Sequence, residues 1–222
     1  MISQKISKIS AVIEETAASC GRNVAEIKLI GVTKTKPIEM IKEAFGAGLI
    51  DIGENYVEDF SDKYQQYHPE GLNYHFIGRL PTKKVIKVVG KARLIHSVGS
   101  IKLAKKIDFV ASEEDICQDI LIQVNQGGEL SKSGADSESL ENLVSEIIQL
   151  SNIRVCGLMS IPPFHEPARP YFSELRNLRD TLQENLSIKL PYLSMGMSGD
   201  FIDAIFEGST HIRVGTSIFG KR

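Results

Sequence analysis

Residues 26–34 read Glu-Ile-Lys-Leu-Ile-Gly-Val-Thr-Lys, a short apolar run that ends in Lys34 and gives way to Thr35, Lys36 and Pro37. A run this short, rich in Ile, Leu and Val and bounded by Gly21 before and Pro37 after, favours a strand buried on both faces over a helix. The ammonium group at its end is either solvated or used, and solvated lysines are the commoner case. Features elsewhere in the chain decide between the two interpretations.

The same alternation of short apolar runs and helical segments continues along the chain. Further apolar runs, which predict strands, occupy residues 49–52, 74–77, 94–98, 120–124, 153–161, 192–195 and 212–214. A helix is expected after Pro37, ending near Gly46, because proline suits a helix start and glycine a helix end. The remaining helical candidates span residues 57–67, 84–90, 101–111, 137–150, 169–186 and 200–208.

Strands that alternate with helices predict a parallel sheet, and eight such signals in 222 residues predict closure into a (β/α)8 barrel. Ile2, Ile6, Ile9 and Ile13 recur at helical spacing, so an amphipathic helix of about five turns is expected before the first strand. No linker-like segment interrupts the pattern, which predicts a single domain over residues 1–222. A doubly wound open sheet is the alternative fold.

The composition is that of an ordinary globular protein. With 26 basic and 28 acidic residues the formal net charge is −2, so no global field indicates nucleic acid or membrane as a partner. The three cysteines are too scattered for a disulfide framework or a Cys-x-x-Cys zinc site, and the five histidines lack ligand spacing, so no metal is expected. His75 and His96 are predicted to be hydrogen-bonding groups of the barrel or its rim. Without a secretory signal or an apolar segment long enough to span a bilayer, the expected location is the cytoplasm.

In a (β/α)8 barrel the loops after the carboxyl ends of the strands form the working face. Two such loops are notable, residues 194–200 (Ser-Met-Gly-Met-Ser-Gly-Asp) and residues 213–216 (Arg-Val-Gly-Thr). Glycines let the backbone approach a ligand, Ser198 and Thr216 add hydroxyl donors, and free N–H groups at a helix start attract phosphate. Asp200 is expected to cap the short helix that follows. Plain connecting turns are the alternative, but the pairing of the loops favours a phosphate site.

Arg213 lies two residues before Gly215, so strand alternation places both on one face. An arginine that points into a barrel needs an acceptor, whereas one on the other face would be an ordinary surface residue, and alternation alone does not decide. Lys34, the phosphate loops and an inward Arg213 together describe a pyridoxal phosphate site, in which the lysine forms a Schiff base and the arginine meets the pyridine nitrogen. Because arginine only donates, it weakens the ring as an electron sink.

Motifs spread over nearly the whole chain carry a resemblance to a known family. They are residues 29–37, 53–56, 75–78, 132–134, 157–159, 193–200 and 213–220. Together they resemble the pyridoxal phosphate homeostasis protein family, whose fold is like the N-terminal barrel of alanine racemase, a fold-type III pyridoxal phosphate barrel. The pair formed by Ser-Met-Gly-Met-Ser and Arg-Val-Gly-Thr is the most specific part of the match.

The resemblance implies that the chain binds pyridoxal phosphate as an internal aldimine and balances its supply in the cytosol, as a monomer or weak dimer, with apo pyridoxal-phosphate-dependent enzymes as possible recipients. The cofactor-binding residues that it implies are Lys34, Asn55, Ser198, Arg213, Gly215 and Thr216. Lys34, rather than Lys36, is the implied attachment point. Lys36 and Lys132 are candidates for a second phosphate-bearing molecule, although solvated loop lysines are the simpler interpretation.

Two segments depart from the family pattern. Residues 81–84 read Pro-Thr-Lys-Lys where the family usually has Gln, a small residue, Asn and Lys, and Gly99 stands where an acidic or amide residue is common. Both lie outside the predicted cofactor site, in the loops after the third and fourth strands, where a partner or exchange site is conceivable.

A racemase of the similar barrel needs a second acid/base group opposite the lysine, supplied by an additional β domain. The sequence ends soon after the eighth strand signal, so no such domain is expected and catalytic residues are predicted to be absent. Tyr56 could serve as an acid, but packing beside a helix is its simpler role. The expected function is therefore a non-catalytic carrier or regulator of pyridoxal phosphate, and the alternative is a small pyridoxal-phosphate-dependent amino-acid racemase or lyase.

Overall fold

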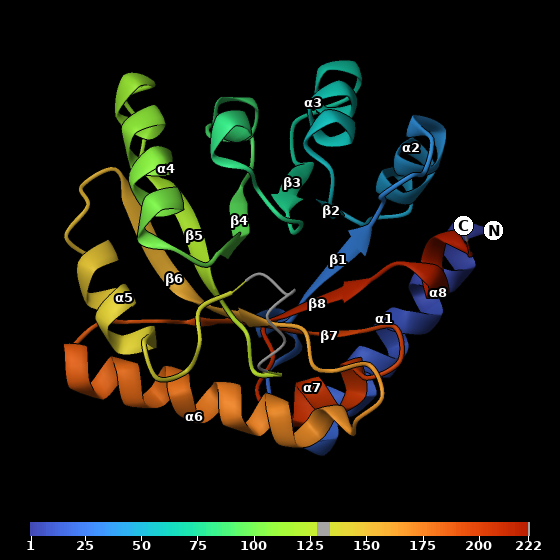
Figure 1. Cartoon of the computed structure of the whole chain (residues 1–222). Helices are drawn as coiled ribbons and strands as arrows, with labels where there is room; N and C mark the ends of the chain where they lie inside the picture. Colours follow the sequence, from blue (N-terminus) through green and yellow to red (C-terminus); the bar gives the residue numbers. More distant parts are fainter. Residues whose placement is uncertain (128–133, 222) are drawn as a thin grey trace.

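The computed structural model describes residues 1–127 and 134–221, and it contains a central ring of strands with helices around it (Figure 1). Within these residues eight parallel strands pair in chain order, and β1 also pairs with β8, so the sheet closes. The strands are β1 Lys28–Val32, β2 Asp51–Glu54, β3 Asn73–Phe76, β4 Leu94–Val98, β5 Gln118–Val124, β6 Ile153–Ser160, β7 Tyr192–Met197 and β8 His211–Val214. The predicted (β/α)8 barrel is confirmed, and the open sheet is not formed.

Helices cover the outside of the barrel and precede β1, as Figure 1 shows. They are α1 Ile2–Ser19, α2 Ile38–Gly46, α3 Val57–Gln66, α4 Ile101–Glu113, α5 Leu140–Ile147, α6 Ala168–Leu186, α7 Phe201–Phe206 and α8 Thr216–Phe219, with the 3-10 helices η1 Val24–Glu26 and η2 Thr82–Lys87. Among the residues described, none of the helices combines the length and apolar character that crossing a bilayer requires.

The main core lies between the outer face of the strands and the helices. Tyr74 and Phe76 alternate with His75 along β3, so the aromatic rings face the helices while the imidazole faces the barrel interior. Phe60 of α3 packs edge-on against both rings, with centroids 5.8 Å away in each case. Each such fully buried side chain contributes about 1.5–3 kcal/mol to folding. This layer fixes β2, β3 and α3 as one rigid unit.

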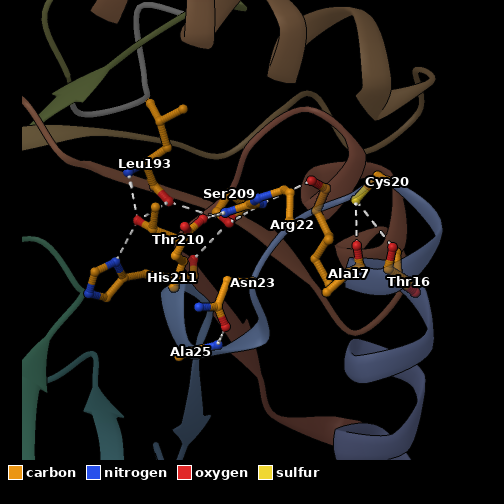
Figure 2. A network of polar contacts seen from close by, with 12 residues as sticks. Thr16, Ala17, Cys20, Arg22, Asn23, Ala25, Leu193, Ser209, Thr210 and His211 are labelled. Carbon is orange, nitrogen blue, oxygen red and sulfur yellow. Dashed lines mark hydrogen bonds and ion pairs between the residues drawn. The ribbon is translucent and has the colours of Figure 1, made fainter.

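Hydrogen bonds between segments distant in the sequence hold together the amino-terminal pole of the barrel, the end at which the strands begin (Figure 2). After the end of α1, Arg22 donates from Nη1 to the backbone carbonyls of Ser209, at 2.7 Å, and Ile205, at 3.0 Å. The Ser209 hydroxyl donates in turn to the carbonyl of Met195, at 2.7 Å. The apolar face of α1 packs against α7, α8 and β8. The leading helix therefore fastens the last strands in place.

Strand boundaries differ from the prediction at β1 and β2. β1 ends at Val32 rather than Lys34, because the backbone turns at Thr35, where φ is +62°. β2 spans Asp51–Glu54 rather than 49–52. Leu49 does not join the sheet, since its N–H bonds the carbonyl of Ala44 at 3.0 Å and its side chain packs in the cluster around α1. The polar ends of β2 belong to the strand because Oδ1 of Asp51 and Oε1 of Glu54 find hydrogen-bond donors inside the fold.

Two predicted helices are shorter or of another type than expected. Instead of an α-helix over 84–90, the chain forms η2, a 3-10 helix. The buried valines 85 and 88 are three residues apart, which matches the three-residue turn of a 3-10 helix. The predicted helix over 137–150 is confirmed only for its central part, α5.

Candidate functional site

The predicted site residues lie at the carboxyl-terminal pole, on strands that are neighbours in the closed sheet. The relevant strands are β7, β8, β1 and β2, which pair consecutively. The residues are Arg213 on β8 and, in the segments that follow the strands, Lys34 after β1, Asn55 after β2, Ser198 after β7, and Gly215 and Thr216 after β8. Segments nearly two hundred residues apart in the sequence therefore meet at one pole of the barrel.

Lys34 is half-buried in a tight turn directly after β1. The N–H of Thr33 still bonds the carbonyl of Gly53 on β2, at 3.0 Å, and the N–H of Lys36 bonds the carbonyl of Thr33, at 3.0 Å. The loop after β8 packs directly against β1, because a side-chain carbon added at Gly215 would lie 3.3 Å from Cβ of Val32. The Lys34 turn is thus held between its two neighbouring strands.

A buried ion pair that the sequence did not indicate supports this turn. Lys63 of α3 donates to Oε1 of Glu54 and to the carbonyl of Thr33, both at 2.7 Å, and the Thr33 hydroxyl donates to the same carboxylate oxygen at 2.6 Å. The Glu54 side chain is fully buried. Burial raises the pKa of Glu54, and the Lys63 ammonium acts in the opposite direction. No spacing rule links residues 54 and 63 to Lys34, so only the fold could reveal this support.

Arg213 points into the barrel, which resolves the ambiguity left by strand alternation. Its Nη1 donates to Oγ of Ser194 at 2.5 Å, and its Nη2 donates to the carbonyl of Ser160 at 2.9 Å. The residue is 4% exposed, and burial lowers the pKa of its guanidinium to about 10, with Asp200 opposing the shift. The charge therefore stays on the arginine at neutral pH.

The two glycine loops present backbone donors. The peptide at Gly196 has φ of +93°, and a side-chain carbon there would lie 2.5 Å from Cβ of Ala204, so only glycine suits this close approach to α7. Asp200 does not cap α7 with its side chain as predicted, but accepts from the N–H of Met197 at 2.5 Å and fixes the loop. Among the described residues, no hydrogen bond is donated by the N–H groups of Ser198, Gly215 or Thr216.

Polar atoms near the same pole lack partners. Oγ of Ser160 and Oδ1 of Asn55 are buried and make no hydrogen bond within the described part of the chain. Asn55 also lines a cleft of about 230 Å³, together with Gly78 and Ile161. Buried polar atoms normally have hydrogen-bond partners. Unpaired polar atoms at one pole therefore fit a ligand that would form hydrogen bonds with them.

The other candidate residues that the structure describes have contacts or positions of their own. Lys36 donates to the carbonyl of Lys221 at 2.9 Å, and Lys132 lies outside the described residues. Tyr56, with 48% exposure, precedes α3 at the surface. At Gly99, one of the departures, a side-chain carbon would lie 2.9 Å from Cα of Gly134, so glycine allows two loops to pack closely.

Histidines and cysteines form no metal site among the residues that the structure describes. His75 and His96 lie inside the barrel and are hydrogen-bonded to each other, with Nδ1 of His75 3.0 Å from Nε2 of His96. Their predicted role as hydrogen-bonding groups of the barrel agrees with this placement. Cys20, Cys117 and Cys156 are free thiols.

The barrel belongs to a known class of fold. The profile of the family described as "Alanine racemase, N-terminal domain" matches residues 22–222. An alanine racemase from Corynebacterium glutamicum superimposes with a TM-score of 0.72 at 16% identity, and the chain covers 61% of its length. That likeness shows a shared barrel fold.

Full-length relatives narrow the assignment. A pyridoxal phosphate homeostasis protein from Aquifex aeolicus is 45% identical over 99% of this chain and 97% of its own length. A protein of the same name from Pseudomonas aeruginosa is 39% identical over the full chain and 96% of its own length. The structure of PipY from Synechococcus elongatus with PLP bound has a TM-score of 0.87 and 31% identity, covering 99% of this chain and all of that one. The chain belongs to the pyridoxal phosphate homeostasis protein family.

Proposed function

We propose that this protein binds pyridoxal 5'-phosphate at the carboxyl-terminal pole and holds it for buffering or delivery. The observation that carries the proposal is the buried guanidinium of Arg213, fixed by Ser194 and Ser160 at the same pole as the Lys34 turn. A cation buried this deeply needs an acceptor, and the ring nitrogen of pyridoxal phosphate is one. The relative whose structure contains PLP supports the same ligand.

Lys34 is the proposed attachment point. When bound, pyridoxal phosphate supplies an aldehyde that condenses with an amine, with release of water, and a ring that accepts electrons. The tight turn and the Glu54–Lys63 pair beneath it set the position of the Lys34 backbone. This support holds the Lys34 backbone in place before the cofactor arrives, which lowers the entropy lost on binding.

Ser198, Gly215 and Thr216 are the proposed phosphate-binding residues. Their N–H groups donate to nothing else in the described part of the chain, and oxyanions bind well to such convergent backbone donors. Asn55 is proposed to contact the cofactor through its unpaired Oδ1. The residues present therefore fit the cofactor at its aldehyde, phosphate and ring nitrogen.

We infer a carrier rather than an enzyme. The relatives bear the name of homeostasis proteins, and Arg213 can only donate to the ring nitrogen, which weakens the ring as an electron sink. Tyr56 is exposed, and its hydroxyl has no partner among the described residues that would activate it as an acid. An amino-acid racemase or lyase is supported by the shared fold alone, and fold does not imply function. We further propose a cytoplasmic protein of one domain, monomeric or weakly dimeric, that supplies apo pyridoxal-phosphate-dependent enzymes.

Borohydride reduction of the protein with added pyridoxal phosphate, followed by peptide mapping, tests the site. We expect the label on Lys34 in the wild type, no label in Lys34→Ala, and an unchanged label in the matched control Lys36→Ala. A label on any other residue, or none in the wild type, would overturn the assignment.

A second experiment separates carrier from enzyme. The loaded protein is incubated with a panel of amino acids while their chirality and breakdown products are followed, and separately with an apo aminotransferase whose recovery of activity is measured. We expect transfer without turnover. Turnover that disappears in Lys34→Ala would reverse this choice.

A further inference from the structure

A line of hydrogen-bonded side chains runs through the barrel from the proposed cofactor arginine to the opposite pole. Nη1 of Arg213 lies 2.5 Å from Oγ of Ser194, and that oxygen is 2.8 Å from Nδ1 of His96. Nε2 of His96 is 3.0 Å from Nδ1 of His75, whose Nε2 is 3.0 Å from Oδ1 of Asp51. These five residues are called the relay below.

The relay crosses the barrel interior rather than following one face of the sheet. Its residues come from β8, β7, β4, β3 and β2, and β4 and β7 are not neighbours, so the contact between His96 and Ser194 spans the interior. No member is more than 5% exposed. Shielded from bulk water, these groups must satisfy one another. Barrel interiors are usually filled by branched apolar residues, so this polar line is a departure from the common pattern.

If both histidines are neutral, the chemistry of the two end groups fixes the direction of every bond between them. The Asp51 carboxylate is an acceptor, so Nε2 of His75 carries the proton that it donates. A neutral His75 then offers Nδ1 as an acceptor, and Nε2–H of His96 donates to it. Nδ1 of His96 in turn accepts from the hydroxyl of Ser194, whose oxygen accepts from Arg213. Each proton is used once and each acceptor is filled.

We propose that Asp51, His75, His96 and Ser194 are positioning residues that hold both histidines as neutral Nε2–H tautomers and fix the Arg213 guanidinium. The inference rests on the proposed function. With its guanidinium fixed, Arg213 presents its remaining donors to the cofactor ring in one orientation. The acidic anchor of this arrangement lies at the opposite end of the barrel from the cofactor. The relay thus gives the amino-terminal pole a part in shaping the cofactor site.

The competing arrangement has His75 protonated on both nitrogens. Nδ1–H of His75 would then donate to His96, which would switch its proton to Nδ1 and donate to Ser194. The serine oxygen would accept twice, and its own proton would lose its acceptor in the relay. Burial holds the pKa of His96 well below its usual value, and the positive charge of Arg213 acts in the same direction.

Other charged groups also face the end of the relay. Lys28, Arg93 and Asp119 line a small cavity of about 30 Å³ together with Asp51 and His211. Burial alone would raise the pKa of Asp51, but the hydrogen bond from His75, together with Lys28 and Asn73, lowers it overall. The carboxylate is therefore ionised at neutral pH, as the relay requires.

Long-range ¹H–¹⁵N NMR of the full-length protein labelled with ¹⁵N-histidine reports each tautomer directly. With ring signals assigned through bonds to the backbone, we expect His75 and His96 to be neutral Nε2–H tautomers at pH 7.5. A charged His75, or a His96 protonated on Nδ1, would overturn the proposal. The measurement needs no cofactor, so the relay is tested even if the protein fails to bind pyridoxal phosphate.

Ser194→Ala and the matched variant Ser209→Ala test the link to Arg213, since both remove a buried hydroxyl but only Ser194 is in the relay. Ser194→Ala should shift the Nδ1 resonance of His96 and weaken pyridoxal phosphate binding about fivefold, the equivalent of one hydrogen bond. Ser209→Ala should change neither. Identical His96 spectra in all three proteins would overturn the relay, and equal affinities would overturn its effect on Arg213.

Discussion

At the amino-terminal pole Arg22 donates to two backbone carbonyls, and the Ser209 hydroxyl bonds a third. At the carboxyl-terminal pole the N–H groups of Ser198 and Gly215 donate to nothing in the described part of the chain, and Oγ of Ser160 is buried without a partner. Both poles are made of the same eight strands, so the difference lies in what their loops leave unpaired.

Stability and binding are thus mostly separated along the barrel axis, and the relay from Asp51 to Arg213 is the link between the two ends. The leading helix packs on one end of the barrel, and Arg22 satisfies backbone carbonyls there. The other end keeps buried polar atoms such as Oγ of Ser160 without a partner, at a cost in folding free energy that a bound ligand would recover. Substitutions at the two poles should therefore differ in kind: loss of stability at one, loss of binding at the other.

The largest expected effect comes from Lys63, a single residue that stabilises the fold and also supports the Lys34 turn. In Lys63→Met the Glu54 carboxyl loses its buried partner and the Lys34 turn loses its support, so the free energy of unfolding should fall by about 3–5 kcal/mol. The free energy of unfolding is measured by urea denaturation. The control is Lys84→Met, whose exposed pair with Glu58 should contribute less than about 1 kcal/mol. Equal stability of the two variants would refute the support role.

Arg22→Ala should destabilise the amino-terminal pole without touching the site. Losing two charge-assisted hydrogen bonds to carbonyls should cost about 2–3 kcal/mol of unfolding free energy. The affinity for pyridoxal phosphate should stay unchanged. Arg79→Ala, which removes an exposed arginine at the other pole, is the control for charge and should change stability little. Weaker cofactor binding by folded Arg22→Ala would show that the poles are not separate.

Acid should destabilise the barrel through its buried histidines. Burial lowers the pKa of His211 to about 3, below the value of about 6.5 in the unfolded chain, so the unfolded state binds the proton first. Stability is then lost as pH falls below about 6.5, by about 2 kcal/mol between pH 7 and pH 5 for this residue. His211→Gln should lose correspondingly less over that range in urea unfolding, whereas His165→Gln, at an exposed position, should follow the wild type. The same acid sensitivity in His211→Gln would contradict this assignment.

The smallest effect concerns the phosphate loops. Ser198→Ala removes one hydroxyl donor and should weaken binding of pyridoxal phosphate by about 1 kcal/mol, or about fivefold, with no loss of stability. Fluorescence titration measures the affinity. Ser112→Ala, on the surface of α4, provides the control. An unchanged affinity would remove Ser198 from the proposed site.

Local patterns were enough to predict the order of elements and the strands that carry the site. Apolar runs and helical spacing were enough to predict the barrel because most strand residues are buried on both faces, and β4 was placed at its observed bounds. Boundaries failed where a side chain's partner is distant. β2 shifts toward Glu54 because Lys63 and Thr33 donate to Oε1 of its carboxylate, and no local rule contains that information.

The site was predictable only in part for the same reason. The motif around residues 194–200 drew attention to glycine and hydroxyl donors, while Ser194 itself, the partner of Arg213, was not among the predicted site residues. His75 and His96 could be identified as hydrogen-bonding groups but not as members of one line, because their contacts join strands separated by many residues. Roles set by contacts across the barrel require the fold.

Hydrogen exchange measured by mass spectrometry, with and without pyridoxal phosphate, tests the separation of the two poles most directly. Peptide N–H groups at the carboxyl-terminal pole that donate to nothing in the described part of the chain should become protected when a phosphate accepts from them, above all in residues 198–199 and 215–216. Residues 20–25 and 205–211, at the amino-terminal pole, should exchange as before. Protection at the amino-terminal pole, or no protection at the carboxyl-terminal loops despite bound cofactor, would contradict this separation.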